Sequence, residues 1–444
     1  MVKSTIIFIA VQTFVIFFVR SVFSGFDHAY PALVSMVRRG FALFNYIRIS
    51  VPLPVKITAG KTLSMNIGIV CYPTYGGSGV VATELGKALA DKGHKIHFIT
   101  YNRPIRLDLF SENIFYHEVR TKDYPLFDFI PYESALASTM VDVALYNQLD
   151  LFHVHYAIPH ASVAYLAKQI LQKYDNHYVP VVTTLHGTDI TLVGKNPAYE
   201  PVVRFSIDQS DGVTAVSAFL KKDTFDHFQV SNDIRVIHNF VDTNRFQRQD
   251  KDHFRKMITG RGEKLLIHTS NFRKVKRVED VMAIFGKVRE QMHVRLLMVG
   301  DGPERRAAEE KCREIGFCDD VIFLGNQNAV EEIYSIGDLF LIPSGSESFG
   351  LSALEAMACG VPVISSNAGG LTELVIDGQT GYVSPIGDVD KMAADALSLL
   401  QNEEKWQTFS RQALAHALTF SVGNIVPKYE AYYEEVIERS RVKS

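Results

Sequence analysis

The sequence has little of the features that assign a chain to a special class. Only four cysteines occur in 444 residues, with no C-x-x-C pair and no spacing typical of zinc ligands: Cys71, Cys312, Cys318 and Cys359. We therefore expect ordinary thiols of a reducing compartment, packed rather than reactive. The formal net charge is only −3 and no basic stripe with interleaved aromatic residues occurs, so nothing favours a nucleic-acid partner.

A hydrophobic run of transmembrane length is also missing. Residues 6–19 are apolar except for Gln12 and Thr13, but they fall short of the roughly 20 residues that a spanning helix needs. Three interpretations stay open for residues 1–64: translated leader sequence before a start at Met65, a membrane anchor, or a cleaved signal peptide. We expect an apolar leader or linker attached to a cytoplasmic protein, with membrane association through residues 6–19 as the alternative.

From Met65 onward, short apolar runs alternate with helical segments, a pattern typical of parallel βαβ units. One series of predicted strands is 67–71, 96–100, 151–155, 179–185 and 212–216, and a second is 235–238, 264–269, 294–299, 321–324, 339–342 and 361–365. We expect an α/β fold with two doubly wound, Rossmann-like domains, 65–238 and 239–420, facing a central crevice that binds ligands. A C-terminal helix in 421–444 is expected to pack back on the first domain.

Residues 344–362, SGSESFGLSALEAMACGVP, place two glutamates on either side of Phe349-Gly350-Leu351. A strand-like run precedes them and strong helix formers follow, so the Ser and Gly residues lie at a helix N-terminus with uncovered amides. Such amides bind phosphate without a cationic side chain. The pattern therefore indicates a nucleotide-sugar site, with amides for the diphosphate and Glu347 and Glu355 for the hydroxyl groups of the sugar and the ribose.

A second glycine-rich stretch, GGSG at residues 76–79, lies between a strand and a helix. Gly77 and Gly79 permit close backbone approach, and Ser78 offers a hydroxyl at the helix start. This is not the dinucleotide pattern, because the second spaced glycine is missing and no acidic residue ends the next strand. An anion site and a turn needed only for packing are the two interpretations.

Two histidine-containing stretches follow predicted strands. TTLHGTD, residues 183–189, displays His186 at the carboxyl edge of the sheet, where it would be either a ligand or part of a helix cap. In HVHYAIPHA, residues 153–161, Tyr156 precedes a helix, and a capping or core role is favoured for His160.

Cations gather after another strand, in SNFRKVKR at residues 270–277. A run of cations is usually only solvated, but Arg273 and Lys276 would face the crevice, where a leaving diphosphate needs positive charge. VGDGPE, residues 299–304, ends the next strand, and a simple turn explains it as well as a nucleotide contact does.

Together these stretches resemble the retaining glycosyltransferases of the GT-B fold, family 4 type, which include sucrose and glycogen synthases. SESFGLSALEAMACGVPVISSNAGGLTELV is similar to their E-x7-E segment, and GGSG, NFRKVKR and VGDGPE occur in the matching order. The resemblance extends from Met65 to the C-terminus. It is strongest to the branch that joins N-acetylglucosamine to L-malate in the first step of bacillithiol synthesis, carried by residues 71–100, 153–171, 183–191 and 270–281.

The resemblance implies a role for each matching residue. Glu355 would bind the ribose and Glu347 the sugar, while Arg273 and Lys276 would stabilise the leaving diphosphate and His186 would lie beside the reacting sugar. The family's Gly-Arg is replaced here by Ser270-Asn271-Phe272-Arg273, so Arg273 is matched by position only. The other donor-binding residues implied are Gly77, Gly79, Phe349, Gly350 and Leu351.

The resemblance also implies UDP-N-acetylglucosamine and L-malate as substrates. Ser78, Tyr156, Thr184 and Arg204 are candidates for binding malate, and Arg204 is attractive because a guanidinium grips a carboxylate with two hydrogen bonds. A surface arginine is its alternative. No cofactor and no metal are expected, because the cations and amides would neutralise the diphosphate, and a homo-oligomer is one state that the sequence leaves open.

The resemblance implies that the α configuration of the sugar is retained. Neither glutamate is assigned as a nucleophile, so we expect the leaving phosphate oxygen to take the proton of the hydroxyl that attacks from the same face. Two rival functions stay open. A related GT-B enzyme acting on a lipid or cell-envelope acceptor predicts a basic amphipathic patch, for which Arg103, Arg106 and Lys122 are too sparse. A non-catalytic nucleotide-sugar binding protein would tolerate loss of Arg273 or Lys276, yet both are present.

Overall fold

The computed structural model describes residues 64–74, 77–107, 111–121, 131–249, 251–260 and 262–441. All of them belong to one compact unit, Ser64–Ser444. The apolar segment 6–19 and the rest of the expected leader lie outside the described residues. Among the helices that are described, none is long and apolar enough to cross a bilayer.

The first sheet has seven parallel strands in the order β3-β2-β1-β4-β5-β6-β7. Its central strands β4 and β5 are buried along their whole length, including their histidine and threonine side chains. Its strands are β1 (Asn66–Val70), β2 (Lys95–Thr100), β3 (Ile114–Glu118), β4 (Leu151–His155), β5 (Val181–Leu185), β6 (Gly212–Ala215) and β7 (Ile234–Val236). The helices along this part are α3 (Gly77–Asp91), α4 (Tyr132–Asn147), α5 (Ser162–Asp175), α6 (Glu200–Gln209) and α7 (Ala218–Phe228).

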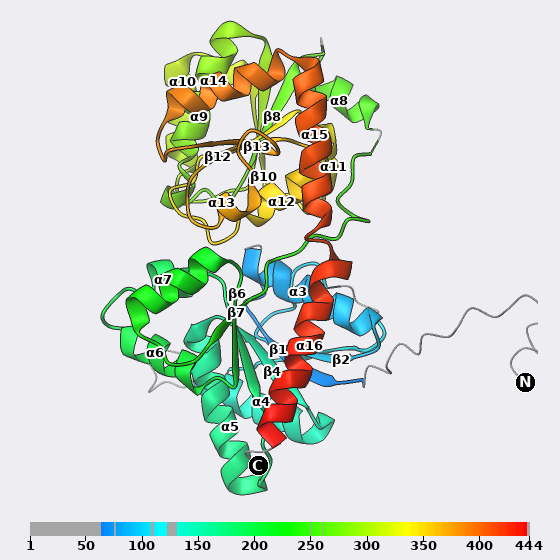
Figure 1. Ribbon diagram of the computed structural model, residues 1–444, viewed down its shortest axis with the longest axis vertical. Helices are drawn as coiled ribbons and strands as arrows, with labels where there is room; N and C mark the ends of the chain where they lie inside the picture. The colour runs from blue at the N-terminus through cyan, green and yellow to red at the C-terminus, as the bar shows by residue number, and fades with distance from the viewer. Residues whose placement is uncertain are drawn as a thin grey trace, which may run out of the picture. The chain divides into compact units, whose positions relative to one another are not determined.

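The second sheet has six parallel strands in the order β10-β9-β8-β11-β12-β13. These strands are β8 (Lys264–Thr269), β9 (Val294–Val299), β10 (Val321–Gly325), β11 (Leu339–Ile342), β12 (Val363–Ser366) and β13 (Gly381–Ser384). The helices are α8 (Asp252–Ile258), α9 (Val278–Gln291), α10 (Arg305–Ile315), α11 (Val330–Ile336), α12 (Leu351–Ala358), α13 (Leu371–Leu374), α14 (Val389–Leu400) and α15 (Glu403–Leu418). Helices flank both faces of this sheet (Figure 1). The predicted α/β fold with two doubly wound parallel sheets is confirmed.

Three strands differ from the prediction by more than their bounds. The segment expected to open the second series, 235–238, pairs as β7 with β6 and closes the first sheet instead. Strand β3 was missed because its edge position leaves most side chains partly or fully exposed, so no apolar run or alternation marks it. Strand β13 was missed because GYVS is only four residues long and half of it is partly exposed.

The last helix, α16 (Val422–Arg441), packs against the first sheet and α3. Its apolar face carries tyrosines whose hydroxyls reach the sheet: Tyr432 Oη accepts from the Val213 amide at 2.9 Å, and Tyr433 Oη lies 2.8 Å from His153 Nδ1. On the same helix, Glu430 Oε1 lies 3.0 Å from His94 Nε2. The C-terminal residues therefore complete the core of the first half of the chain.

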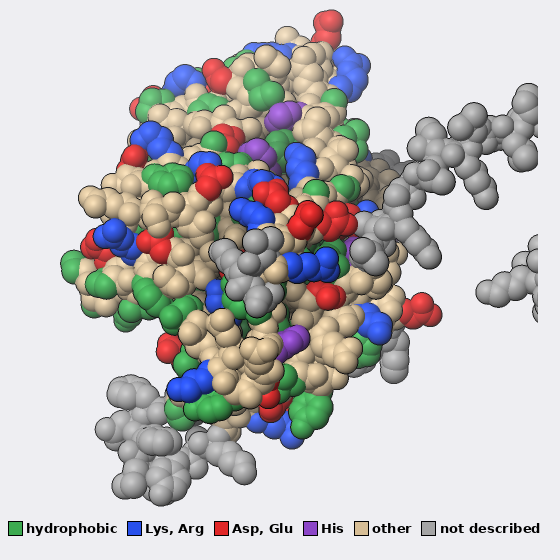
Figure 2. Space-filling view, turned by 60° about the horizontal axis from the view of Figure 1, so that its bottom comes forward, with side chains coloured by type: hydrophobic (Ala, Val, Ile, Leu, Met, Phe, Trp, Pro, Cys, Tyr) green, Lys and Arg blue, Asp and Glu red, His purple; other side chains and the backbone are tan. Residues whose placement is uncertain are grey.

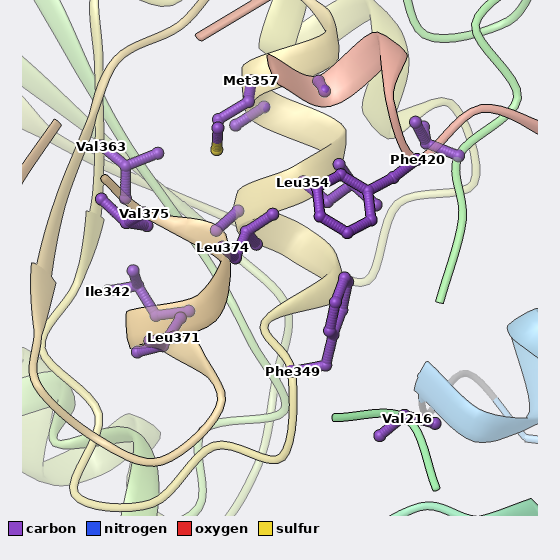
Figure 3. Packing of buried hydrophobic residues seen from close by; sticks show 14 of the residues in the cluster. Val216, Ile342, Phe349, Leu354, Met357, Val363, Leu371, Leu374, Val375 and Phe420 are labelled. Carbon is purple, nitrogen blue, oxygen red and sulfur yellow. The ribbon is translucent and has the colours of Figure 1, made fainter. Parts of the chain in front are cut away.

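Helix α12 is held by a buried apolar cluster on one face of the second sheet (Figure 3). Leu354 and Met357 are fully buried, and Phe349, in the loop just before the helix, is 2% exposed. The Phe349 ring contacts Phe420 edge to face, with centroids 5.7 Å apart. This packing fixes the position of the loop that carries Glu347.

Basic side chains lie among acidic ones on the face drawn in Figure 2, in keeping with the small net charge.

Candidate active site

Each sheet reverses its strand order at one place, between β1 and β4 in the first and between β8 and β11 in the second. In open α/β sheets, ligands bind outside the carboxyl ends of the strands at such points. The segments between these four strands and the helices that follow carry Tyr156, Lys276 and Glu347, and Ser78 lies in the first turn of α3. The topology thus brings chemistry-bearing side chains to both switch points.

Two helix N-termini meet at the switch points. A Cβ on Gly77, the first residue of α3, would lie 3.9 Å from Leu351 Cδ2, at the first residue of α12. Helix α12 begins after Gly350, whose φ of 97° puts it in the left-handed region, and no side chain caps its amides. Uncapped amides and two positive dipole ends make this contact suited to an anionic group.

Gly79 is required by the fold of the loop before α3. A Cβ there would lie 2.4 Å from the Tyr72 carbonyl oxygen and 2.8 Å from that of Thr74. The loop therefore folds directly onto the first turn of α3, and any side chain at Gly79 would displace it.

Glu347 lies at the centre of a short polar network. Its carboxylate accepts a hydrogen bond from Lys276 Nζ and one from Ser344 Oγ at 3.2 Å. Its backbone carbonyl accepts from the Gly370 amide at 2.9 Å, and a Cβ on Gly370 would meet the Ser348 carbonyl oxygen at 2.2 Å. The glycines after β12 thus hold the Glu347 loop in place.

The cationic loop after β8 packs against the loop after β9, which contains the VGDGPE sequence of residues 299–304. A Cβ on Gly300 would lie 1.8 Å from the Ser270 carbonyl oxygen, and one on Gly302 would lie 2.1 Å from that of Asn271. These glycines therefore allow close packing of two loops. Lys276 is half-buried and paired with Glu347, whereas Arg273 is exposed and has no ion pair among the described residues.

Glu355 is buried in α12, eight residues beyond Glu347. Burial raises the pKa of this carboxyl, while the Arg106 guanidinium opposes the rise. Arg106 Nη1 lies 3.5 Å from Glu355 Oε1, although Arg106 belongs to the segment between β2 and β3 of the first sheet. The two halves of the chain therefore touch at this carboxylate.

His186 follows β5 and lies in a stack of buried rings. Its Nε2 lies 2.8 Å from His155 Nδ1, and burial lowers the pKa of His186 to about 3. The loop is held by Asp189, whose carboxylate accepts from the amides of Gly187 at 2.9 Å and Ala157 at 2.9 Å. His160 donates from Nδ1 to the His155 carbonyl at 2.6 Å, which fits the core role favoured for it.

Gly187 brings this loop against the second half of the chain. Its φ is 115°, and a Cβ there would lie 1.6 Å from Ser348 Oγ. The contact between Gly187 and Ser348 therefore brings His186, the residue before Gly187, next to the loop that carries Glu347.

Two of the four acceptor candidates lie together. Ser78 Oγ and Tyr156 Oη are 2.6 Å apart, and Tyr156 has a φ of 86°, unusual for a residue other than glycine. Burial raises the pKa of Tyr156 to about 12, so its hydroxyl stays protonated at neutral pH. Thr184 lies behind them in β5, fully buried and hydrogen-bonded to His153 Nε2 at 2.7 Å.

Arg204 is not joined to the other candidates by any contact among the described residues. Its side chain is 54% exposed on α6 and lies 4.0 Å from Asp208, one turn further along the same helix. The hollow beside it is lined by α6 alone, which favours the alternative interpretation of Arg204 as a surface arginine.

Sequence reasoning missed three residues of this site: Arg106, Ser344 and Ser348. Ser344 and Ser348 lie in the quoted motif, but nothing in their spacing showed a contact with Glu347 or Gly187. Arg106 and Glu355 are separated by 249 positions, so no local pattern relates them.

Among the described residues, no group of three or more His, Cys, Asp or Glu side chains is arranged to hold a metal ion. All four cysteines are free, and burial raises the pKa of Cys71 and of Cys359 to about 12. These two thiols are therefore poor nucleophiles, as expected for packed cysteines, but Cys318 is exposed, so the prediction of packing is wrong for that residue.

Comparison with known proteins matches both halves of the chain to glycosyltransferases. Residues 75–245 match Glycosyltransferase Family 4, and residues 249–416 match Glycosyl transferases group 1. The chain is 45% identical to N-acetyl-alpha-D-glucosaminyl L-malate synthase of Bacillus anthracis over 377 residues, which cover 84% of this chain and 98% of the relative. It is 30% identical to D-inositol 3-phosphate glycosyltransferase of Mycobacterium marinum over 308 residues, 65% of this chain and 64% of the relative.

Solved structures agree on the fold. Sucrose-phosphate synthase from Thermosynechococcus elongatus has a TM-score of 0.70 at 20% identity, covering 84% of this chain and 100% of that chain. Anabaena HepE in complex with UDP and glucose has a TM-score of 0.69 at 20% identity, covering 83% and 99%. With both halves matched and a relative covered almost completely, the chain belongs to the family 4 (group 1) glycosyltransferases and has their GT-B fold.

Proposed function

We propose that this enzyme transfers N-acetylglucosamine from UDP-N-acetylglucosamine to the hydroxyl of L-malate. The product would be N-acetyl-alpha-D-glucosaminyl L-malate, the first intermediate of bacillithiol synthesis. The observation that carries the proposal is the 45% identity over 98% of the Bacillus anthracis synthase.

The donor's groups would be divided among the loops of the second sheet. The amides of Phe349, Gly350 and Leu351 suit the diphosphate, because α12 begins there without a side-chain cap. Glu347 would accept hydrogen bonds from the sugar, and Lys276 would place its positive charge next to the leaving phosphate. Arg273 is exposed and unpaired with any described acid, so it is available to the diphosphate as a second cation.

The acceptor would lie on the first sheet's side, beside Ser78 and Tyr156. Their hydroxyls share a hydrogen bond of 2.6 Å, which leaves the O–H of the accepting partner free to donate to a carboxylate of malate. Thr184 would support them from β5, and His186 would offer its backbone carbonyl or its ring to the donor sugar. Arg204 has no part in this arrangement, because it lies on the exposed side of α6.

The reaction would proceed on one face of the sugar. The bond between the anomeric carbon and the β-phosphate oxygen breaks, the malate hydroxyl oxygen bonds to that carbon from the same side, and its proton passes to the departing oxygen. No enzyme carboxylate is needed as nucleophile, and Glu347 is already engaged by Lys276 and Ser344. The protein supplies orientation and charge, and the α configuration is retained.

We further propose that no divalent metal is required and that the enzyme is cytoplasmic. Lys276, Arg273 and the amides of α12 would supply the positive charge that a metal supplies in other enzymes. Four free cysteines among the described residues support a reducing compartment.

The test is release of UDP by the full-length chain given UDP-N-acetylglucosamine, with and without L-malate and with EDTA. We expect malate-dependent release that EDTA does not reduce, and an α-linked product by proton NMR. UDP release that does not depend on malate but rises with a lipid or cell-envelope acceptor would show that malate is not the acceptor. Inhibition by EDTA that added magnesium reverses would overturn metal independence.

A further inference from the structure

Glu355 is the more enclosed of the two glutamates in the E-x7-E segment. Its side chain is 9% exposed, and it lies in α12 of the second half of the chain. Water therefore contributes little to stabilising its charge, and nearby cations decide whether it is ionised.

Arg106 is the cation that approaches this carboxylate most closely. It comes from the first half of the chain, and its Nη1 lies 3.5 Å from Glu355 Oε1. The guanidinium also lies 5.7 Å from the centre of the Phe246 ring and 3.9 Å from Glu84 Oε1. Its side chain is only 16% exposed, so its position is defined by contacts rather than by solvent.

The other cation in reach is already committed. Arg245 Nη2 donates to Glu331 Oε2 at 2.9 Å and to the Asn328 carbonyl at 2.9 Å. Glu84, on α3, adds negative charge, and its Oε1 is buried without a hydrogen-bond partner. The uncharged groups facing Glu355 are Tyr334 on α11 and Cys359 at the end of α12. Arg106 is therefore the cation on which the charge of Glu355 chiefly depends.

A ribose presents two adjacent hydroxyls, and both donate most strongly to one carboxylate when it is ionised, because both of its oxygens are then charged acceptors. We propose that Arg106 is a positioning residue for the ribose of the nucleotide donor: it crosses from the first domain and holds Glu355 charged and oriented. This inference rests on the proposed function, which assigns the ribose to Glu355. Recognition of the ribose then requires both domains, although the carboxylate belongs to one.

The test compares binding of UDP and of 2′,3′-dideoxy-UDP to the full-length protein by calorimetry. The ratio of their dissociation constants isolates the ribose hydroxyls, because the base and phosphates are shared. For the wild type we expect a ratio of about ten or more, as for hydrogen bonds to a charged group. Arg106→Gln should bring the ratio below about three at pH 6.5 and restore it as the pH rises and Glu355 ionises, whereas the wild-type ratio stays level.

Double-mutant analysis separates positioning from general damage. Glu355→Gln should bring the ratio of the two dissociation constants to about one. Adding Arg106→Gln to Glu355→Gln should not change that ratio further. Arg306→Gln, on an arginine whose side chain is 88% exposed, is the matched control and should keep the wild-type ratio. Where Arg106→Gln does not fold, Arg106→Lys keeps the charge and should retain most of the ratio.

Three outcomes decide against the inference. A wild-type ratio in Arg106→Gln across the pH range, or a ratio in Arg106→Lys as low as in Glu355→Gln, would overturn it while leaving the proposed function intact. A wild-type protein that does not bind UDP would overturn the proposed function, and this inference with it.

Discussion

Gly187 and Ser348 touch so closely that no side chain fits between them: a Cβ on Gly187 would lie 1.6 Å from Ser348 Oγ. Gly187 belongs to the loop after β5, and Ser348 follows Glu347 in the loop after β11. A glycine there lets His186 and the donor-binding loop come together.

Gly187→Ala is therefore expected to lower both stability and activity. The left-handed φ of 115° costs an alanine about 1–3 kcal/mol, and the Ser348 loop must also move, which should reduce turnover at least tenfold. Gly93→Ala is the matched control, since Gly93 has a φ of 96° with nothing within 4 Å of its Cβ position. Gly93→Ala should lower the free energy of unfolding in urea, because its backbone is strained in the same way, but it should leave turnover unchanged.

Ser348→Gly removes the colliding atoms and should restore part of the activity when combined with Gly187→Ala. If the double variant is no more active than Gly187→Ala alone, the contact is not the cause of the loss.

The pair Lys276 and Glu347 is expected to matter for transfer more than for nucleotide binding. Lys276→Met removes a cation from the leaving diphosphate and should lower kcat by about 100-fold or more. Glu347→Gln should lower kcat/KM for the sugar donor but leave the Kd of UDP, which has no sugar, within about threefold of the wild type. The exposed Glu404→Gln is the control. Equal weakening of UDP and UDP-sugar binding in Glu347→Gln would contradict the assignment to the sugar.

Tyr156→Phe is expected to affect the acceptor selectively. It removes one hydroxyl of the pair with Ser78, and the loss of a hydrogen bond to a carboxylate should raise KM for malate by about tenfold. KM for the donor should stay unchanged. Tyr174→Phe, on a tyrosine that is 75% exposed, should change neither constant. A rise in KM for the donor and not for malate would show that Tyr156 binds the donor rather than the acceptor.

The buried histidines predict loss of stability in acid. Burial lowers the pKa of His153 and His186 to about 3 and that of His160 to about 4, below the ordinary value of 6.5. Between pH 6.5 and about 4 the unfolded chain binds these protons and the folded chain does not. Each ring therefore lowers the free energy of unfolding by about 1.4 kcal/mol per pH unit as the pH falls through this window.

The carboxyl of Asp189 acts in the opposite direction. Burial raises the pKa of Asp189 from 3.8 to about 6, so the folded chain binds this proton first and gains stability as the pH falls below about 6. Asp189 thus offsets one histidine. Urea unfolding at pH 7.5 and 5.5 should show lower stability at 5.5, and His160→Asn should reduce the difference in the free energy of unfolding between these two pH values by about 1.4 kcal/mol in total. An unchanged dependence in His160→Asn would mean that its ring is already protonated in the folded chain.

The elements best predicted from the sequence are those whose signal is local. Strands β4, β8, β9 and β11 were predicted to the residue because apolar runs of strand length are bounded by polar or turn residues. Of the glycines recognised as special, Gly79 lies at a close contact and Gly350 in a left-handed conformation, whereas a Cβ on Gly77 would make only an ordinary contact, 3.9 Å from Leu351 Cδ2.

Arg204 shows where local reasoning fails. A guanidinium was chosen for its chemistry, but only the packing of α6 determines which way it faces, and it faces solvent. Tyr156 and Ser78 were named separately, and the folded chain brings them within a hydrogen bond although 78 positions lie between them.

By itself the sequence determined the alternating α/β pattern, the strand ends that carry polar residues, and the E-x7-E segment that marks the family. Hydrophobic periodicity and glycine conformation act over a few residues, so they can be read along the chain. Only the tertiary structure decided that Arg106 meets Glu355, that Gly187 meets Ser348, and that the last helix completes the first sheet. These contacts join loops and helices that are distant along the chain, and their partners are selected by packing and charge in three dimensions, which leave no periodic trace.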